Sequence, residues 1–70
     1  MTVPETIGSI IRARRERLKM NRQQLAIEAR MTWGNVDRIE KGLQEPTIPT
    51  LRRIAKALGC EVRDLMPKKG

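Results

Sequence analysis

The feature that most constrains the fold of this chain is the placement of its prolines and glycines. They divide the 70-residue sequence into short segments, and within each segment apolar residues recur three or four positions apart. This spacing is typical of the buried face of a helix. The chain breaks fall at Pro4, Gly34, Gly42, Pro46, Pro49, Gly59 and Pro67.

The apolar residues that would form the core are nearly all aliphatic. The sequence contains one Trp and no Phe or Tyr, which favours helices over a sheet. A chain of this size buries only about 60 % of the surface that its unfolded form exposes. We expect one small all-helical domain over residues 1–66, followed by a disordered basic tail over 67–70, with no deep substrate cleft.

The first two of five predicted helices lie in the N-terminal half. One covers about 4 to 19, and Thr2 and Glu5 are spaced as a capping box at its start. The second begins after Asn21, a good N-cap residue, and ends near Arg30. The stripes expected to be buried are Ile7, Ile10, Ile11 and Leu18 in the first helix and Leu25, Ala26 and Ala29 in the second.

Three further helices are predicted over about 33 to 41, 48 to 58 and 62 to 66. Thr32 and Thr47 are the expected N-caps of the first two, and Gly42 and Gly59 are expected to end them. The residues expected to face inward are Val36, Ile39, Leu51, Ile54, Ala55 and Leu58, with Val62, Leu65 and Met66 in the short last helix.

The charge balance favours a polyanionic partner. Fifteen Lys and Arg against eight Asp and Glu give a net charge of +7 at pH 7. A small basic domain points first to nucleic acid and second to an anionic membrane, although this charge also fits an ordinary soluble surface.

The residue types also exclude several classes of site. The chain has no His and one Cys, so we exclude hydrolytic triads, internal disulfides and cysteine-based zinc sites. No apolar run is long enough to span a bilayer, and no signal peptide is visible. We expect a cytoplasmic protein that is not an enzyme, has no cofactor or metal, and packs Cys60 as a small hydrophobe.

Two short helices joined by a short connection occupy the stretch between Asn21 and Pro46. Such a pair is typical of a helix-turn-helix, in which the second helix lies in the DNA major groove, although any helical hairpin can show the pattern. At 100° per residue, Val36 and Ile39 share the inner side of the second helix. The outer side carries Gly34, Asp37, Arg38 and Lys41.

Four strings of the sequence are distinctive in combination. They are NRQQLA at 21–26, RIEKG at 38–42, EPT at 45–47 and LRRIAKALGC at 51–60. Together they resemble the phage repressor/Cro-type (XRE-like) helix-turn-helix family, and the resemblance runs from about Ile7 to Met66. It implies a five-helix lambda-repressor-like domain that acts as a homodimer on palindromic double-stranded operator DNA.

The outer side of the helix at 33 to 41 carries the candidate base contacts. Arg38 is the strongest, because a guanidinium can bond O6 and N7 of guanine together; contact with a phosphate or an acidic neighbour is the alternative. Gly34 weakens a helix by up to about 1 kcal/mol relative to Ala. It fits either a close approach of the backbone to DNA or a frayed first turn. The base-contact candidates are Trp33, Gly34, Asn35, Asp37 and Arg38.

Trp33 stands where the family usually has a polar residue that reads a base. Its ring is expected either to press on a thymine methyl or a sugar edge, or to cover a gap between the second and third helices. Arg30 stands where the family commonly has Gly, so the turn between these helices must form without glycine.

Residues at the ends of these helices are candidates for phosphate contact. Asn21 and Arg22 match family positions that commonly touch the DNA backbone. Arg22 replaces the family's Gln, which adds attraction for phosphate and could remove a bridge to the recognition helix. The phosphate-contact candidates are Asn21, Arg22, Gln23, Thr32, Lys41 and Gln44.

Arg15 is expected to face inward, because it lies one helical turn after Ile11. The resemblance implies a partly buried ion pair between Arg15 and Glu40 that holds the first helix against the third. The other basic residues of the first and fourth helices are expected to be solvated. They are Arg12, Arg14, Arg17, Lys19, Arg52, Arg53 and Lys56.

The leading hypothesis is a sequence-specific DNA-binding transcriptional regulator that acts as a repressor. The alternative is an antitoxin-like protein-interaction module that also autoregulates its gene, supported by Ile27 and Trp33 as exposed apolar residues. A membrane-bound basic helix is less favoured, because the apolar stripe of the first helix is needed for the core. The candidate dimer surface is formed by Val62, Leu65 and Met66.

Overall fold

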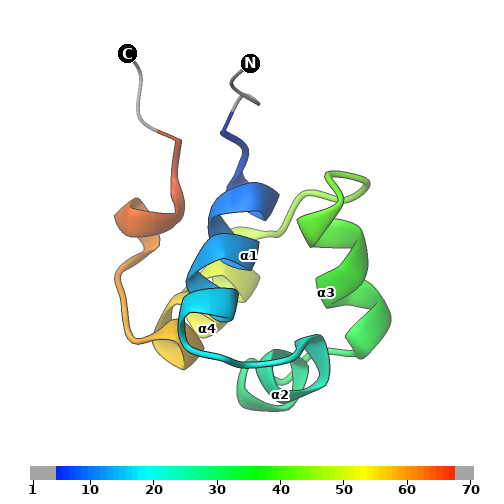
Figure 1. Cartoon of the computed structure of the whole chain (residues 1–70). Coiled ribbons are helices and arrows are strands. Elements are labelled where there is room, and N and C mark those ends of the chain that lie inside the picture. The colour runs from blue at the N-terminus through cyan, green and yellow to red at the C-terminus, as the bar shows by residue number, and fades with distance from the viewer. Residues whose placement is uncertain (1–4, 68–70) are drawn as a thin grey trace.

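The computed structural model describes residues 5–67, which form four α-helices and a final 3₁₀ turn (Figure 1). No strand occurs within this range. The predicted disordered tail falls mainly on residues 68–70, which lie outside the described part of the chain. The elements in chain order are α1 (Ile7–Arg17), α2 (Arg22–Glu28), α3 (Trp33–Glu40), α4 (Ile48–Leu58) and η1 (Val62–Leu65).

The predicted start of the first helix is wrong by about one turn. Thr6 is the N-cap of α1, and its hydroxyl accepts a hydrogen bond from the Ser9 amide while the Ser9 hydroxyl accepts one from the Thr6 amide. This reciprocal pair satisfies two otherwise free N–H groups, so Glu5 lies before the helix rather than in its capping box. Thr2 and Pro4 lie outside the described residues.

The elements pack around a single aliphatic core. The predicted inward residues of α2, α3 and α4 are buried, whereas Leu18 at the end of α1 is 52 % exposed and does not belong to the stripe. Leu18 is the C-cap of α1, where the chain already leaves the helical path. The core consists of Ile11, Leu25, Ala26, Ala29, Val36, Ile39, Leu51, Ile54, Ala55, Leu58 and Leu65.

The predicted fifth α-helix is instead the 3₁₀ turn η1. The segment is four residues long, and Met66 after it already has an extended backbone. So short a segment makes too few hydrogen bonds to stabilise an α-helix. Leu65 is fully buried, and Val62 is partly buried against the core. Of the three residues expected to form a dimer surface, only Met66 is exposed, at 37 %.

A close contact between α1 and α3 fixes the position of α3. A Cβ atom at Gly8 would lie 2.1 Å from the carbonyl oxygen of Ile39, so the two backbones meet where only glycine fits. The apolar periodicity gave no sign of this role, because Gly8 contributes no side chain to the pattern.

The turn between α2 and α3 forms without glycine, as the sequence requires. Arg30 adopts a left-handed conformation with φ of 57°, and the Met31 amide donates to the Ala26 carbonyl at 2.8 Å. A non-glycine residue in this region costs about 1–2 kcal/mol. The turn that leads into α3 therefore contains one residue, Arg30, with an unfavourable backbone conformation.

Candidate nucleic-acid interface

Helix α3 presents one apolar and one polar side, and its position in the fold decides which side is accessible. Val36 and Ile39 are each 2 % exposed and pack into the core. Thr32 caps the helix, since its hydroxyl accepts from the Asn35 amide at 3.2 Å. In Figure 1, α3 lies at one side of the molecule, and α1 and α2 contact it. The side that carries Arg38 faces away from the core.

A buried ionic cluster connects α3 to both preceding helices. The Arg15 guanidinium donates to both Glu40 carboxylate oxygens, from Nε at 2.7 Å and from Nη2 at 3.1 Å. Arg15 also donates to the Met20 carbonyl at 2.7 Å, and Arg22 Nε donates to Glu40 at 3.0 Å. One buried carboxylate thus holds two guanidinium groups from two other helices.

Arg22 stands where the family has Gln, and it connects α2 to α3 through ionic contacts in place of the bridge that a Gln could form. Besides its hydrogen bond to Glu40, its Nε lies 3.7 Å from an Asp37 carboxylate oxygen. Lys41 lies 3.1 Å from the other oxygen of Asp37. Asp37 and Lys41, proposed from sequence as DNA contacts, therefore neutralise each other on the surface of α3.

Hydrogen bonding to Glu40 raises the pKa of Arg15, and this effect outweighs the opposing effect of burial. Arg15 is therefore charged at any pH at which the protein is handled. The cluster has no unpaired buried polar side-chain atom among the described residues. It is a structural connection rather than a site for an external ligand.

Arg38 is exposed and is held against the outer side of α3. Its Nε donates to the Gln44 side-chain oxygen at 3.1 Å, and its Nη2 donates to the Asn35 side-chain oxygen. A Cβ at Gly34 would lie 3.3 Å from Arg38 Nη1, so the guanidinium lies over Gly34. The sequence suggested that Gly34 allows close approach to DNA, whereas in this structure it leaves room for Arg38.

The other candidate residues occupy the edges of this surface. Trp33 is 51 % exposed at the N-terminal end of α3, so about half of its side chain is accessible to solvent. Asn21 caps α2, accepting from the Gln24 amide at 2.8 Å, and Gln23 is exposed one residue after Arg22. Asn21, Arg22, Gln23, Thr32 and Gln44 all lie at or near helix ends next to α3.

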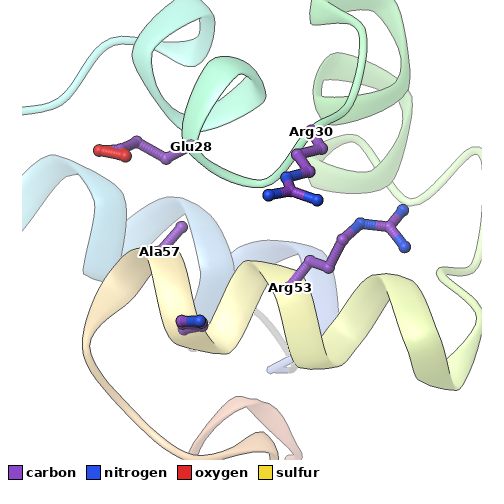
Figure 2. A pocket seen from close by; sticks show the side chains of 5 residues that line it. Glu28, Arg30, Arg53 and Ala57 are labelled. Carbon is purple, nitrogen blue, oxygen red and sulfur yellow. The ribbon is translucent and has the colours of Figure 1, made fainter.

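A second basic region lies between α2 and α4. Figure 2 shows Arg30 and Arg53 on facing sides of a hollow. The hollow has a volume of about 430 Å³, and no residue of α3 lines it. Arg53 was expected to be solvated, but its Nε donates to the Ala29 carbonyl at the end of α2 at 2.9 Å. Arg53 therefore connects α4 to α2 and caps a helix terminus.

Two features are absent from the described part of the chain. Within residues 5–67 there is no group of three or more His, Cys, Asp or Glu side chains placed to hold a metal ion. None of the described helices is long and apolar enough to cross a membrane.

Comparisons with known proteins agree with this geometry. Residues 11–65 match the family model described as helix-turn-helix. The chain is 37 % identical to an uncharacterised HTH-type transcriptional regulator of Sinorhizobium fredii over 93 % of its own length, but spans only a third (33 %) of that relative.

Two solved structures show where this fold occurs. The P22 c2 repressor bound to a synthetic operator is 29 % identical, with a TM-score of 0.84 over 89 % of this chain and 94 % of the repressor chain. Hydroxypropylphosphonic acid epoxidase from S. wedmorenis is 34 % identical, with a TM-score of 0.82 over 91 % of this chain but only 34 % of the enzyme. The same fold thus forms nearly the whole of one repressor chain and a part of an enzyme.

Proposed function

Because this chain belongs to the helix-turn-helix family, we propose that it binds double-stranded DNA sequence-specifically and represses transcription. The P22 c2 repressor, which it resembles over nearly its whole length, was crystallised on an operator. The proposal includes a cytoplasmic location, because the DNA that it would regulate lies there. It assigns no catalytic role to this domain.

The observation that carries the proposal is the exposed, unneutralised cation on the outer side of α3. No carboxylate lies within salt-bridge distance of Arg38 among residues 5–67, whereas the cations around it, Arg22 and Lys41, are paired with acids. Phosphate contacts supply affinity without regard to sequence, and a guanidinium in the major groove supplies discrimination. The free charge of Arg38 on this side supports a role for it in reading bases.

The remaining candidates have supporting roles in the proposal. Trp33, Gly34, Asn35 and Asp37 line the same side of α3 and would lie nearest the bases. The polar groups at the ends of α2 and α3 would contact the sugar-phosphate backbone, and they are Asn21, Arg22, Gln23, Thr32, Lys41 and Gln44. A homodimer on a palindromic operator would double these contacts.

A protein partner is the second candidate function. Ile27 is 66 % exposed on α2, on the opposite side from buried Leu25 and Ala29. If Ile27 serves a protein contact, Ile27→Ser leaves DNA affinity unchanged and weakens capture of the partner. Loss of DNA affinity in this variant would instead place Ile27 at the DNA interface.

Selection of duplexes from a random-sequence pool tests the main proposal. We expect recovered duplexes to share a motif and to bind more tightly than bulk competitor DNA by at least about a thousandfold at physiological salt. Arg38→Ala should relax the preference at one base position in each half-site. Equal binding of selected and competitor DNA would refute sequence-specific recognition.

A further inference from the structure

We propose that Asn35 and Gln44 are positioning residues that hold the Arg38 guanidinium, a group with donors only, so that it selects guanine. This inference rests on the proposed DNA-binding function. It goes beyond it by naming the base and by giving Asn35 and Gln44 a role other than direct contact with DNA.

The first observation is the room above Gly34. An added Cβ would lie 3.3 Å from Arg38 Nη1 and 4.0 Å from its Cζ, so the guanidinium rests on the helix surface where no side chain stands. The backbone of α3 at Gly34 therefore limits, on one side, the positions that the Arg38 guanidinium can take. A long flexible side chain that is confined in this way loses less conformational freedom when it binds.

The second observation is the pair of oxygen atoms that hold the guanidinium. Arg38 Nε donates to Gln44 Oε1 at 3.1 Å, and Nη2 donates to Asn35 Oδ1. A guanidinium has donors only, so the amide atoms facing it must be the oxygens. Each amide oxygen thus accepts one hydrogen bond from Arg38, and the two contacts hold the guanidinium from two directions.

The third observation is the absence of a competing acid. Asp37 precedes Arg38 in the chain, but its carboxylate lies 3.1 Å from Lys41 and 3.7 Å from Arg22. Within residues 5–67 no carboxylate forms a salt bridge with Arg38. The guanidinium is thus positioned by neutral groups and keeps its full charge.

These observations define which base fits. Guanine presents two acceptors, O6 and N7, in the major groove, whereas adenine presents one acceptor and one donor and cytosine a donor. Asn reads adenine through its oxygen and its NH₂ together, and the oxygen of Asn35 is committed to Arg38. The Arg38 guanidinium, which has donors only, therefore matches guanine better than adenine or cytosine.

The test is selection and competition on wild-type protein and three variants. We expect wild type to prefer guanine at one position per half-site by roughly fivefold to 150-fold, the range of a good bidentate contact. Asn35→Ala and Gln44→Ala should each lower this preference severalfold, measured for each variant as the ratio of its affinities for the guanine duplex and for the same duplex with another base at that position. Circular dichroism melting should show that both variants fold, because the Thr32 cap uses the Asn35 backbone only.

Gln44→Glu separates positioning from direct reading. Its carboxylate still accepts from Arg38, so the guanine preference should persist, while total affinity falls because the new charge repels phosphate. Loss of the preference in this variant would overturn the positioning role of Gln44. Leu43→Ala is the matched neutral control, since Leu43 is 73 % exposed in the same loop.

Failure of the proposed DNA-binding function and failure of the present inference would give different results. If wild type binds no selected duplex better than competitor, the proposed function fails. If wild type selects a motif, but that motif has no guanine dependent on Arg38, or Asn35→Ala and Gln44→Ala retain the full preference, then only the present inference is overturned. Replacing the selected guanine by 7-deazaguanine, which lacks N7, should reduce wild-type binding and mimic the variants.

Discussion

Three arginines of this protein show how neighbours, rather than charge, decide what a side chain does. Arg15 is buried against Glu40, Arg53 donates to the Ala29 carbonyl, and Arg38 lies exposed over Gly34. The inward position of Arg15 could be predicted because it follows Ile11 by one turn. The partner of Arg53 could not, because Ala29 lies on another helix and is far away in the chain.

Glu40 is a residue whose replacement should cost much of the stability, because its carboxylate is buried between two arginines. Glu40→Ala leaves the buried guanidinium of Arg15 without its counter-charge and Arg22 with only Asp37 nearby, and we expect a loss of about 3–5 kcal/mol in the free energy of unfolding. Urea denaturation measures it. Glu16→Ala is the matched control, since Glu16 pairs with Arg12 on the surface and should cost under about 1 kcal/mol. Similar losses in both variants would contradict a buried cluster.

Arg30 offers the opposite prediction, a gain in stability. Its φ of 57° suits glycine, so Arg30→Gly should raise the free energy of unfolding by about 1 kcal/mol. Arg30→Ala keeps the unfavourable backbone and should give no gain. A gain in both variants would assign the effect to removal of positive charge from the hollow beside Arg53.

Cys60 provides a prediction that depends on pH. Burial raises the pKa of the Cys60 thiol, and nearby Arg14 opposes this only in part. The protein therefore gains stability from the protonated thiol at pH values below the unfolded pKa, and loses it as pH rises through the folded pKa. Alkylation by iodoacetamide should show its midpoint at higher pH in folded than in urea-unfolded protein. Identical midpoints would contradict the shift.

The helices differ in how well their ends could be predicted. Helices α2, α3 and α4 begin after the predicted caps, because Asn21, Thr32 and Thr47 are each followed by an amide that their side chain accepts from. The start of α1 was misplaced because two cap sequences compete there, and Thr6 with Ser9 forms the box. Local sequence patterns therefore identify candidate N-cap residues, but they do not show which of two nearby candidates caps the helix.

The junction of α1 and α3 is the element contact most sensitive to volume. Gly8→Ala would bring a methyl group within 2.1 Å of the Ile39 carbonyl oxygen, and backbone cannot move aside without shifting α3. We expect a loss of more than about 3 kcal/mol, or failure to fold. Gly34→Ala, where the nearest atom belongs to the flexible Arg38, should be neutral or stabilising by up to about 1 kcal/mol. Equal losses in thermal melting would refute the contrast.

At the scale of the whole molecule, the sequence predicts which side of α3 forms the candidate site, but not which side chains contact one another there. The polar side of α3 followed from Val36 and Ile39, which the period of the helix places inward. The links from Arg22 to Glu40 and from Arg38 to Gln44 could not be predicted, because they depend on how α2 and the loop after α3 pack against α3. Tertiary contacts between polar side chains leave no periodic signal.

The size of the domain leads to a prediction about the spacing of the half-sites on DNA. Its longest dimension is 32 Å, close to the roughly 34 Å of one turn of B-DNA, so one copy reaches one half-site. If two copies act together, they read half-sites on one face of the duplex. Inserting five base pairs between selected half-sites turns the second by about half a turn and should abolish cooperative binding, and inserting ten should restore it in part. Equal affinity at every spacing in a gel-shift titration would show that each copy binds alone.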